Sequence, residues 1–160
     1  CAARNGRCGA AGAGTVIAPR SAPEARILAI DDEPANLALI RAVLLREGYT
    51  QIETLTDPRQ AAERHLAFAP DLVLLDLMMP SIDGYALLDS LGRLTGPDDL
   101  VPIMVLTADT SIEAKRRALA LGARDIVTKP FDVFEFALRV ANLIDLRMMF
   151  ARARGLSQKA

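Results

Sequence analysis

Short apolar runs that favour β-strand alternate with helical patterns along this chain, and this alternation limits the possible folds more than any other feature. Because crossovers between parallel strands are right-handed, each helix packs against the sheet, and both faces become covered. The sequence therefore predicts an α/β fold with a doubly wound, parallel, five-stranded sheet. The expected strands are 27–30, 52–55, 72–75, 103–106 and 126–128, and the expected helices are 35–46, 59–68, 85–94, 111–121 and one from about 133.

The composition of the strands predicts their places in the sheet. The runs ILAI, LVLL and IMVL are apolar throughout, as expected of central strands that helices cover on both faces. The run IETL alternates polar and apolar residues, so we expect it at an edge.

The composition of the whole chain excludes several classes of protein. The net charge of −1 gives no sign of direct nucleic-acid binding. No apolar stretch reaches the roughly 20 residues that cross a bilayer, so we expect no membrane association. Both cysteines, Cys1 and Cys8, lie near the start, and a body without cysteine suits the cytoplasm.

The two ends of the chain differ from its body. Residues 1–24 lack any periodicity, and we interpret them as a disordered leader or as an addition to the natural chain. The basic residues near the other end are interpreted as a solvated tail. They are Arg147, Arg152, Arg154 and Lys159.

Polar residues follow four of the five expected strands, at the point where each strand ends. Asp31 and Asp32 follow the first strand, Asp76 the third, Thr107 the fourth and Lys129 the fifth. In an open α/β sheet, ligands bind outside the carboxyl ends of the strands, so these side chains are expected to meet at one edge.

Three carboxylates at one edge repel one another unless a cation holds them. Oxygen ligands suit Mg²⁺, or Mn²⁺ with its similar preferences. A carboxylate beside such a cation can act as a nucleophile toward phosphorus. Asp76 is the best-placed nucleophile, because it ends the most apolar strand, where an aspartate without a partner or a function is costly to bury.

Structural interpretations of single residues compete with this one. Asp31 or Asp32 could cap the helix that begins near Pro34. The single histidine, His65, is expected on the surface. Several apolar residues and one glycine are expected to fill the core or to form turns. Met78, Met79, Phe131, Phe134 and Phe136 are assigned to the core or to shape filling, and Gly84 to a turn.

The segments ILAIDDEPAN, LVLLDLMMPSIDG, IMVLTA and VTKPF, in this order, resemble the signature of bacterial response-regulator receiver domains. The resemblance extends over a domain at 25–146. It implies the flavodoxin-like (βα)5 strand order 2-1-3-4-5. It also implies a two-component phosphorelay, in which a sensor histidine kinase or a phosphotransfer protein donates a phosphoryl group and the domain controls an output domain or partner.

The resemblance assigns roles to the acidic residues. Asp76 is the expected phosphorylation site and also contacts the metal. Asp32 is expected to bind Mg²⁺ directly, while Asp31 helps through water or by shaping the pocket. The backbone carbonyl of Met78 is the remaining expected ligand.

The resemblance also implies how the domain switches. Thr107 is expected to hydrogen-bond the phosphoryl group, and Ala108 leaves room for it. Lys129 is expected to pair with Asp76 before phosphorylation, after which it pairs with the phosphoryl group, and the peptide to Pro130 is expected to be cis. At Ile126 many receivers have Tyr or Phe, so the aromatic half of their switch is absent here.

The last helical pattern continues past the expected domain. Residues 147–160 are interpreted as a linker toward an output domain that is absent from this chain, resembling receivers that precede cyclic-di-GMP phosphodiesterase or histidine-kinase modules. A homodimer through this helix, or through the face of the fourth helix, fifth strand and fifth helix, is a further expectation. A frayed end is the alternative.

Two other functions stay open. A phosphohydrolase of the haloacid dehalogenase type also forms an aspartyl phosphate, but Met78 stands where its general acid is expected. A receiver-like module that acts by partner contact alone is the other, although the intact acidic residues argue against it.

Overall fold

The sheet has five parallel strands in the order β2-β1-β3-β4-β5. A computed structural model, which describes residues 22–157, provides the structure. The predicted order is therefore confirmed, and the run IETL lies in edge strand β2, as expected. The strands are β1 Arg26–Ile30, β2 Gln51–Leu55, β3 Leu72–Asp76, β4 Ile103–Thr107 and β5 Asp125–Thr128.

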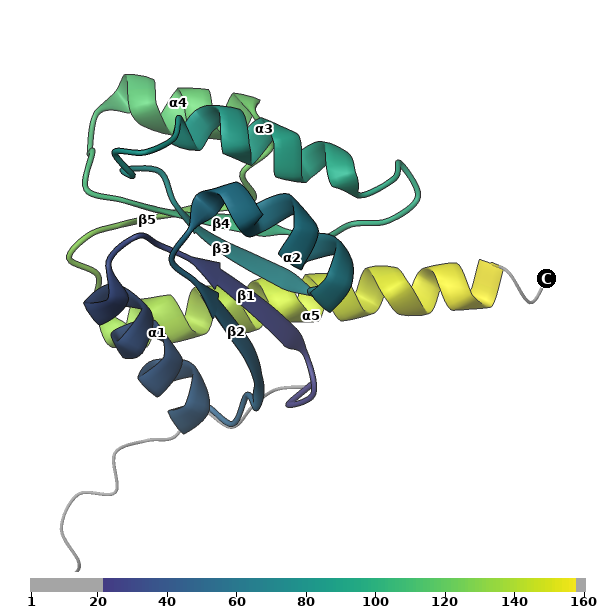
Figure 1. Cartoon of the computed structure of the whole chain (residues 1–160). Coiled ribbons are helices and arrows are strands. Elements are labelled where there is room, and N and C mark those ends of the chain that lie inside the picture. The colour runs from purple at the N-terminus through teal and green to yellow at the C-terminus, as the bar shows by residue number, and fades with distance from the viewer. Residues whose placement is uncertain (1–21, 158–160) are drawn as a thin grey trace, which may run out of the picture.

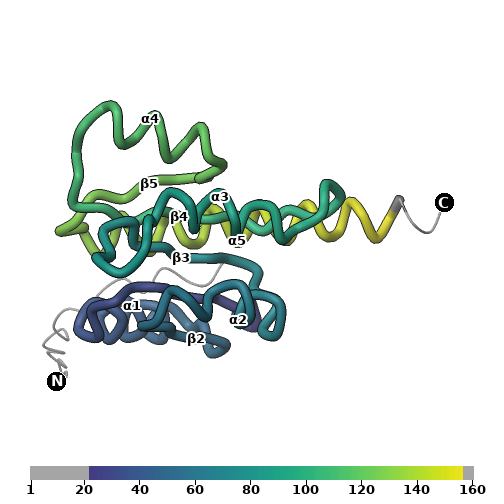
Figure 2. The backbone as a smooth tube through the Cα atoms, turned by 45° about the horizontal axis from the view of Figure 1, so that its top comes forward, coloured from purple at the N-terminus to yellow at the C-terminus, as the bar shows by residue number. Residues whose placement is uncertain are grey.

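Helices cover both faces of this sheet (Figures 1 and 2). Helices α1 and α5 pack on one face, whereas α2, α3 and α4 pack on the other. A 3₁₀ turn, η1 Pro58–Gln60, leads into α2. The α-helices are α1 Pro34–Arg46, α2 Ala61–Phe68, α3 Gly84–Leu94, α4 Ile112–Ala120 and α5 Val133–Ser157.

Strand β3 shows why the central strands are apolar throughout. Every residue from Leu72 to Asp76 is buried. Leu72 and Leu74 pack with α1 and α5, while Val73 and Leu75 pack with α2, α3 and α4, because successive side chains of a strand point to opposite faces. Two apolar cores therefore enclose the strand that ends in Asp76.

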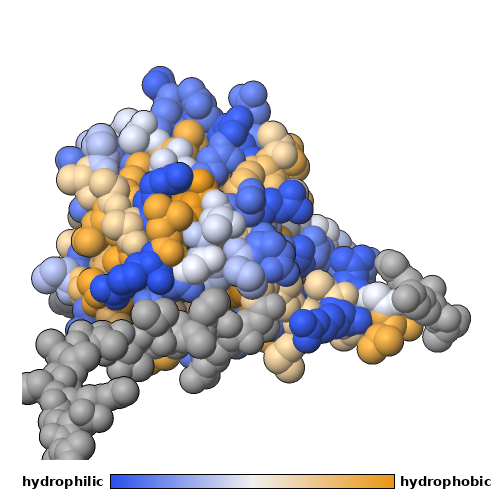
Figure 3. Space-filling view, turned by 90° about the horizontal axis from the view of Figure 1, so that it is seen from below, coloured by the Kyte–Doolittle hydropathy of each residue, from blue (hydrophilic) through white to orange (hydrophobic). Residues whose placement is uncertain are grey.

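Helix α5 is the longest element, with 25 residues. It runs along the sheet and continues past it, so that its end stands clear of the body (Figure 1). On the face shown in Figure 3, this end carries hydrophobic and hydrophilic residues side by side. Among residues 22–157, no helix combines the length and the apolar character that crossing a bilayer requires.

The expectation of a surface histidine is wrong, because His65 is only 5% exposed. Ala61 and His65 are four residues apart on α2, so both point to the inner side of this short helix. Burial lowers the pKa of His65, because the charged imidazolium is disfavoured there.

Two of the apolar residues assigned to the core are exposed instead. Phe134 is 57% exposed near the start of α5, while Phe136 is buried and stacks on Phe131 with ring centroids 4.8 Å apart. Met78 is exposed and Met79 is buried. Phe134 and Phe136 are two residues apart on a helix and point to different sides, so only Phe136 reaches the core. Of the adjacent pair Met78 and Met79, only Met79 reaches the core.

The solvated-tail interpretation is wrong for Arg147. Its Nε lies 3.3 Å from Asp71 Oδ1, and its Nη1 donates to Asp99 and, at 3.0 Å, to the backbone oxygen of Leu100. Arg154 lies 3.6 Å from Asp99. These contacts tie α5 to the amino-terminal ends of β3 and β4. Lys159 and most of the expected leader lie outside the described residues.

Gly84 is the first residue of α3 and not a turn residue. Asp83 caps the helix by accepting a hydrogen bond from Tyr85 N at 3.0 Å. A Cβ atom added at Gly84 would lie 2.3 Å from the backbone oxygen of Leu77. Only glycine therefore lets α3 begin this close to the end of β3.

We expect Gly84→Ala to lower the free energy of unfolding by about 1–3 kcal/mol, because the backbone of Leu77 must move. Gly92→Ala is the matched control, since it changes the same helix where nothing lies within 4 Å. This control is expected to gain roughly 0.5–1 kcal/mol from helix propensity. Urea unfolding measures both, and equal effects at the two glycines would contradict the steric explanation.

Candidate functional site

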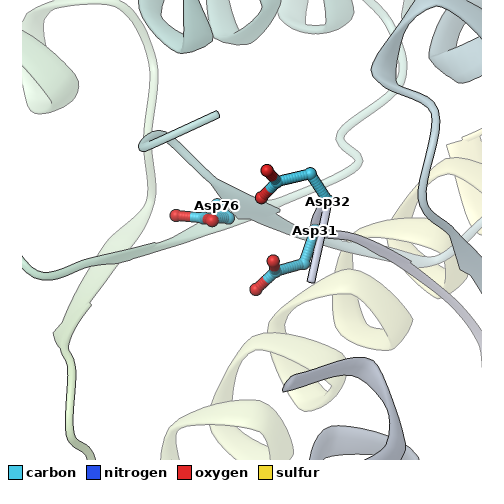
Figure 4. Close-up of side chains that lie close together, drawn as sticks. All are labelled: Asp31, Asp32 and Asp76. Carbon is cyan, nitrogen blue, oxygen red and sulfur yellow. The ribbon is translucent and has the colours of Figure 1, made fainter. Parts of the chain in front are cut away.

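Every polar residue predicted for the edge of the sheet lies there. Asp31 and Asp32 follow β1, Asp76 ends β3, Thr107 ends β4, and Lys129 follows β5. All strands are parallel, so these ends share one edge. Figure 4 shows the three aspartates close together at the ends of β1 and β3. One carboxylate oxygen of each lies within 4.8 Å of the others.

Asp31 is buried, and both of its carboxylate oxygens accept hydrogen bonds. Oδ1 accepts from Glu33 N at 2.9 Å, and Oδ2 accepts from Asn36 Nδ2 at 3.1 Å and from Lys129 Nζ at 2.8 Å. The capping residue of α1 is Glu33, so the structure does not support the alternative in which Asp31 or Asp32 caps this helix. Asp31 instead holds the loop and orients the lysine.

Lys129 lies between two carboxylates. Its Nζ is 2.8 Å from Asp31 Oδ2 and 3.4 Å from Asp76 Oδ2. Its backbone N–H donates to Thr107 O at 2.8 Å, which fixes the residue beside the end of β4. The peptide to Pro130 is cis, as the resemblance implies. The ammonium thus contacts the predicted partner, Asp76, but lies closer to Asp31.

Asp76 is buried at the centre of the site. Its Oδ1 accepts a hydrogen bond from Met78 N at 3.0 Å. Burial raises the pKa of Asp76, while the hydrogen bond from Met78 and the charge of Lys129 oppose that rise. The negative charge of this carboxylate is therefore unfavourable in its buried position, and additional positive charge nearby would stabilise it.

Thr107 is buried, and its Oγ1 accepts a hydrogen bond from Asp109 N at 3.1 Å. The hydroxyl hydrogen can still be donated, because a threonine hydroxyl both donates and accepts. Ala108 is exposed beside it. Ile126 is half-buried and packs against the core under α2, α3 and α4.

Asp32 differs from the other two aspartates. It is half-buried, and no described residue makes a hydrogen bond or ion pair with it. Its oxygens are therefore available to a ligand. With one ammonium for three carboxylates, the site keeps an excess of negative charge when all are ionised, and its oxygen donors suit a hard divalent cation such as Mg²⁺ or Mn²⁺.

Sequence reasoning missed the contribution of Asn36, which fixes Asp31 from the first turns of α1. It also missed the backbone N–H of Met78, which fixes Asp76.

A family model described as a response regulator receiver domain matches residues 27–141. The DNA-binding dual master transcriptional regulator RpaA of Synechocystis sp. is 38% identical over 74% of this chain and 48% of that protein. The transcriptional regulatory protein TrcR of Mycobacterium tuberculosis is 35% identical over 74% of this chain and 45% of its own length. The chain thus spans about half the length of these curated relatives.

Solved structures show the same architecture. The chemotaxis protein CheY4 of Vibrio cholerae is 27% identical, with a TM-score of 0.69 over 75% of this chain and 98% of that chain. The receiver domain of the Francisella response regulator 1452 is 28% identical, with a TM-score of 0.66 over 76% and 98%. A CheY-like protein from Methanospirillum hungatei, 24% identical with a TM-score of 0.71 over 79% and 98%, shares the fold.

We expect Asp76→Asn to raise the thermal unfolding midpoint in the presence of a chelator. Because burial raises the pKa of Asp76 in the folded state, ionisation of this residue costs stability. This gain in the unfolding midpoint should be absent below about pH 3.9, where the carboxyl of Asp76 in the parent chain is protonated in both the folded and the unfolded state. It should appear as the pH rises through the raised pKa that Asp76 has in the folded state. A gain of about 1 kcal/mol corresponds to roughly 2–4 °C in a domain of this size.

Calorimetry of both proteins across this pH range measures the effect. A pH-independent difference would mean that the substitution acts through packing and not through charge.

Proposed function

This chain belongs to the response regulator receiver domain family of two-component systems, and from that premise we propose that it accepts a phosphoryl group on Asp76. The observation that carries the proposal is the meeting of three carboxylates, one hydroxyl and one ammonium at a single sheet edge. A sensor histidine kinase or a phosphotransfer protein is the proposed donor, acting in the cytoplasm.

Asp76 is the proposed nucleophile. One of its carboxylate oxygens attacks the phosphorus of a phosphohistidine, the P–N bond breaks, and the electron pair stays on the imidazole nitrogen. The product is an acyl phosphate. The hydrogen bond from Met78 N fixes the carboxylate for this attack. Slow hydrolysis of the acyl phosphate by the domain itself returns Asp76 to its starting state.

Lys129 and Thr107 are proposed to stabilise charge on the phosphoryl oxygens. The ammonium of Lys129 already lies 3.4 Å from Asp76, so it is close to the position that those oxygens take. The hydroxyl of Thr107 can donate a hydrogen bond while its oxygen accepts from Asp109 N. Ala108 leaves the approach open because its side chain is small.

Receiver domains of this family generally bind Mg²⁺, and the donor set here fits that ion. Asp32 is the proposed direct ligand, because its carboxylate makes no hydrogen bond or ion pair within residues 22–157. Asp76 and the backbone carbonyl of Met78 are the further proposed ligands, and Asp31 acts mainly by orienting Lys129. The ion, when bound, supplies positive charge for the phosphoryl oxygens.

Switching is proposed to pass through the loop between β4 and α4, because Ile126 cannot act as an aromatic switch. Thr107 Oγ1 accepts from Asp109 N, and Asp109 Oδ1 accepts from Ser111 N at 2.9 Å. Ser111 Oγ then accepts from Ala114 N at 3.2 Å and so caps α4. A shift of Thr107 toward a phosphoryl oxygen therefore affects the first turn of α4.

Transcriptional control is the proposed output of the signalling pathway. Relatives that are 35–38% identical are named as transcriptional regulators, and one of them as DNA-binding. This chain covers only about half of those proteins, so DNA binding is not assigned to the receiver domain itself.

Incubation with Mg²⁺ and a small phosphodonor is expected to add one phosphoryl group, which Asp76→Asn abolishes. Asp83→Asn is the matched control, because Asp83 caps α3 in the neighbouring loop and asparagine caps equally well. Intact-mass spectrometry reads the modification. Equal labelling of Asp76→Asn and the parent chain would exclude Asp76 as the nucleophile, and multiple turnover of a phosphate ester would favour a phosphohydrolase instead.

Asp32→Asn is expected to weaken Mg²⁺ binding by at least about tenfold, or about 1.4 kcal/mol, because a direct ligand loses its charge. Asp109→Asn is the control, since it removes a charge from the adjacent loop outside the carboxylate cluster. Titration calorimetry measures both affinities. Equal losses would indicate that general electrostatic attraction, and not ligation, accounts for the binding.

A further inference from the structure

A groove lies between α4 and the loop that joins β3 to α3, and we call it the α3–α4 groove. Helices α3 and α4 lie side by side on one face of the sheet (Figures 1 and 2). The groove has a volume of about 510 Å³, comparable to sites that hold a ligand. Met78 is 59% exposed, so the domain itself leaves part of the apolar lining uncovered. The apolar residues that line the groove from the loop are Leu77, Met78, Met79, Pro80 and Ile82.

Arg117 of α4 forms one wall of the α3–α4 groove. Its guanidinium carbon Cζ lies 4.0 Å from the centroid of the Tyr85 ring, and Tyr85 lines the groove as well. A guanidinium at this distance over an aromatic ring is attracted to it, so Tyr85 holds the charge in place. Arg117 makes no ion pair within residues 22–157, not even with Glu113 one turn earlier on α4. Its N–H groups are therefore available to a carboxylate.

Two further cations stand beside Arg117. Lys115, Arg116 and Arg117 follow one another on α4, and all three are exposed. No described carboxylate forms an ion pair with any of them. Asp83 also lines the groove, where it caps α3 by accepting a hydrogen bond from Tyr85 N at 3.0 Å. The groove thus combines an apolar lining with an unpaired cation at its wall, and this cation complements a carboxylate.

We propose that the α3–α4 groove docks a short acidic segment of a partner protein. Large apolar side chains of that segment enter the groove beside Met78 and Ile82, and a carboxylate of the segment pairs with Arg117. Burial of the apolar side chains supplies the hydrophobic part of the binding, while the ion pair selects which segments bind. The proposal goes beyond phosphoryl transfer, because docking requires neither a phosphodonor nor a metal.

Two other occupants fit the α3–α4 groove less well. A nucleic-acid backbone would meet the cations of α4, but it has no apolar side chain for the lining next to them. A second copy with its own groove against this one would bring the cations of both copies together, and like charges oppose such an interface. The groove also differs from the expected dimer face. It uses the side of α4 that contacts Tyr85 of α3, and not the side toward β5 and α5.

Selection of random short peptides displayed on phage tests the docking, with the full chain as target and without Mg²⁺ or a phosphodonor. We expect the selected peptides to combine large apolar residues with aspartate or glutamate. In titration calorimetry, Arg117→Gln is expected to weaken the binding of such a peptide at least about tenfold, because the ion pair is lost. Arg116→Gln is the matched control, since it removes the same charge from a residue outside the lining, and about threefold or less is expected. Failure to select this pattern, or equal losses in the two variants, overturns the proposal.

Tryptophan fluorescence tests where the peptide binds, because this chain contains no tryptophan. Tyr85→Trp places a single tryptophan in the groove, and its ring can still hold the guanidinium of Arg117. A selected peptide without tryptophan is expected to shift the emission of this variant. Leu66→Trp on α2 is the control, since Leu66 is 66% exposed and lies outside the groove, and its emission is expected to stay unchanged. No shift in Tyr85→Trp, or an equal shift in the control, contradicts docking in the α3–α4 groove.

Discussion

The ammonium of Lys129 lies between Asp31 and Asp76, and the functional edge of the sheet depends on this contact. Both aspartates are buried, and buried carboxylates at such short range repel one another in a medium of low dielectric. One lysine cannot balance three carboxylates, so the site keeps its affinity for further positive charge. Burial and repulsion thus account for the raised pKa of Asp76 and for the fit to a divalent cation.

Parallel strand topology made most of this site predictable from sequence. Once the strands at 27–30 and 72–75 are recognised, Asp31 and Asp76 must lie at the same edge, because neighbouring parallel strands end on the same side. The sequence could not show that Lys129 lies closer to Asp31 than to Asp76. That preference depends on side-chain positions to within less than 1 Å, and on Asn36 and Glu33 N, which orient Asp31.

Predictions for single residues on helices were less successful. His65 and Phe134 were assigned to the wrong environments, because which side of a helix faces the sheet depends on how the whole helix packs. The partners of Arg147 were also missed, since Asp71 and Asp99 are far from it in sequence and meet it only after the sheet has formed. Long-range ion pairs of this kind have no local signal.

The ion pairs at the two ends of β3 fasten the segment that carries α5 at two separated points. Lys129, just before α5, contacts Asp76 at one end of the strand, and Arg147 contacts Asp71 before the other end. Phe136, Val140 and Ile144 are buried between these two points. This part of α5 therefore cannot slide along the sheet without breaking both ion pairs and the packing between them.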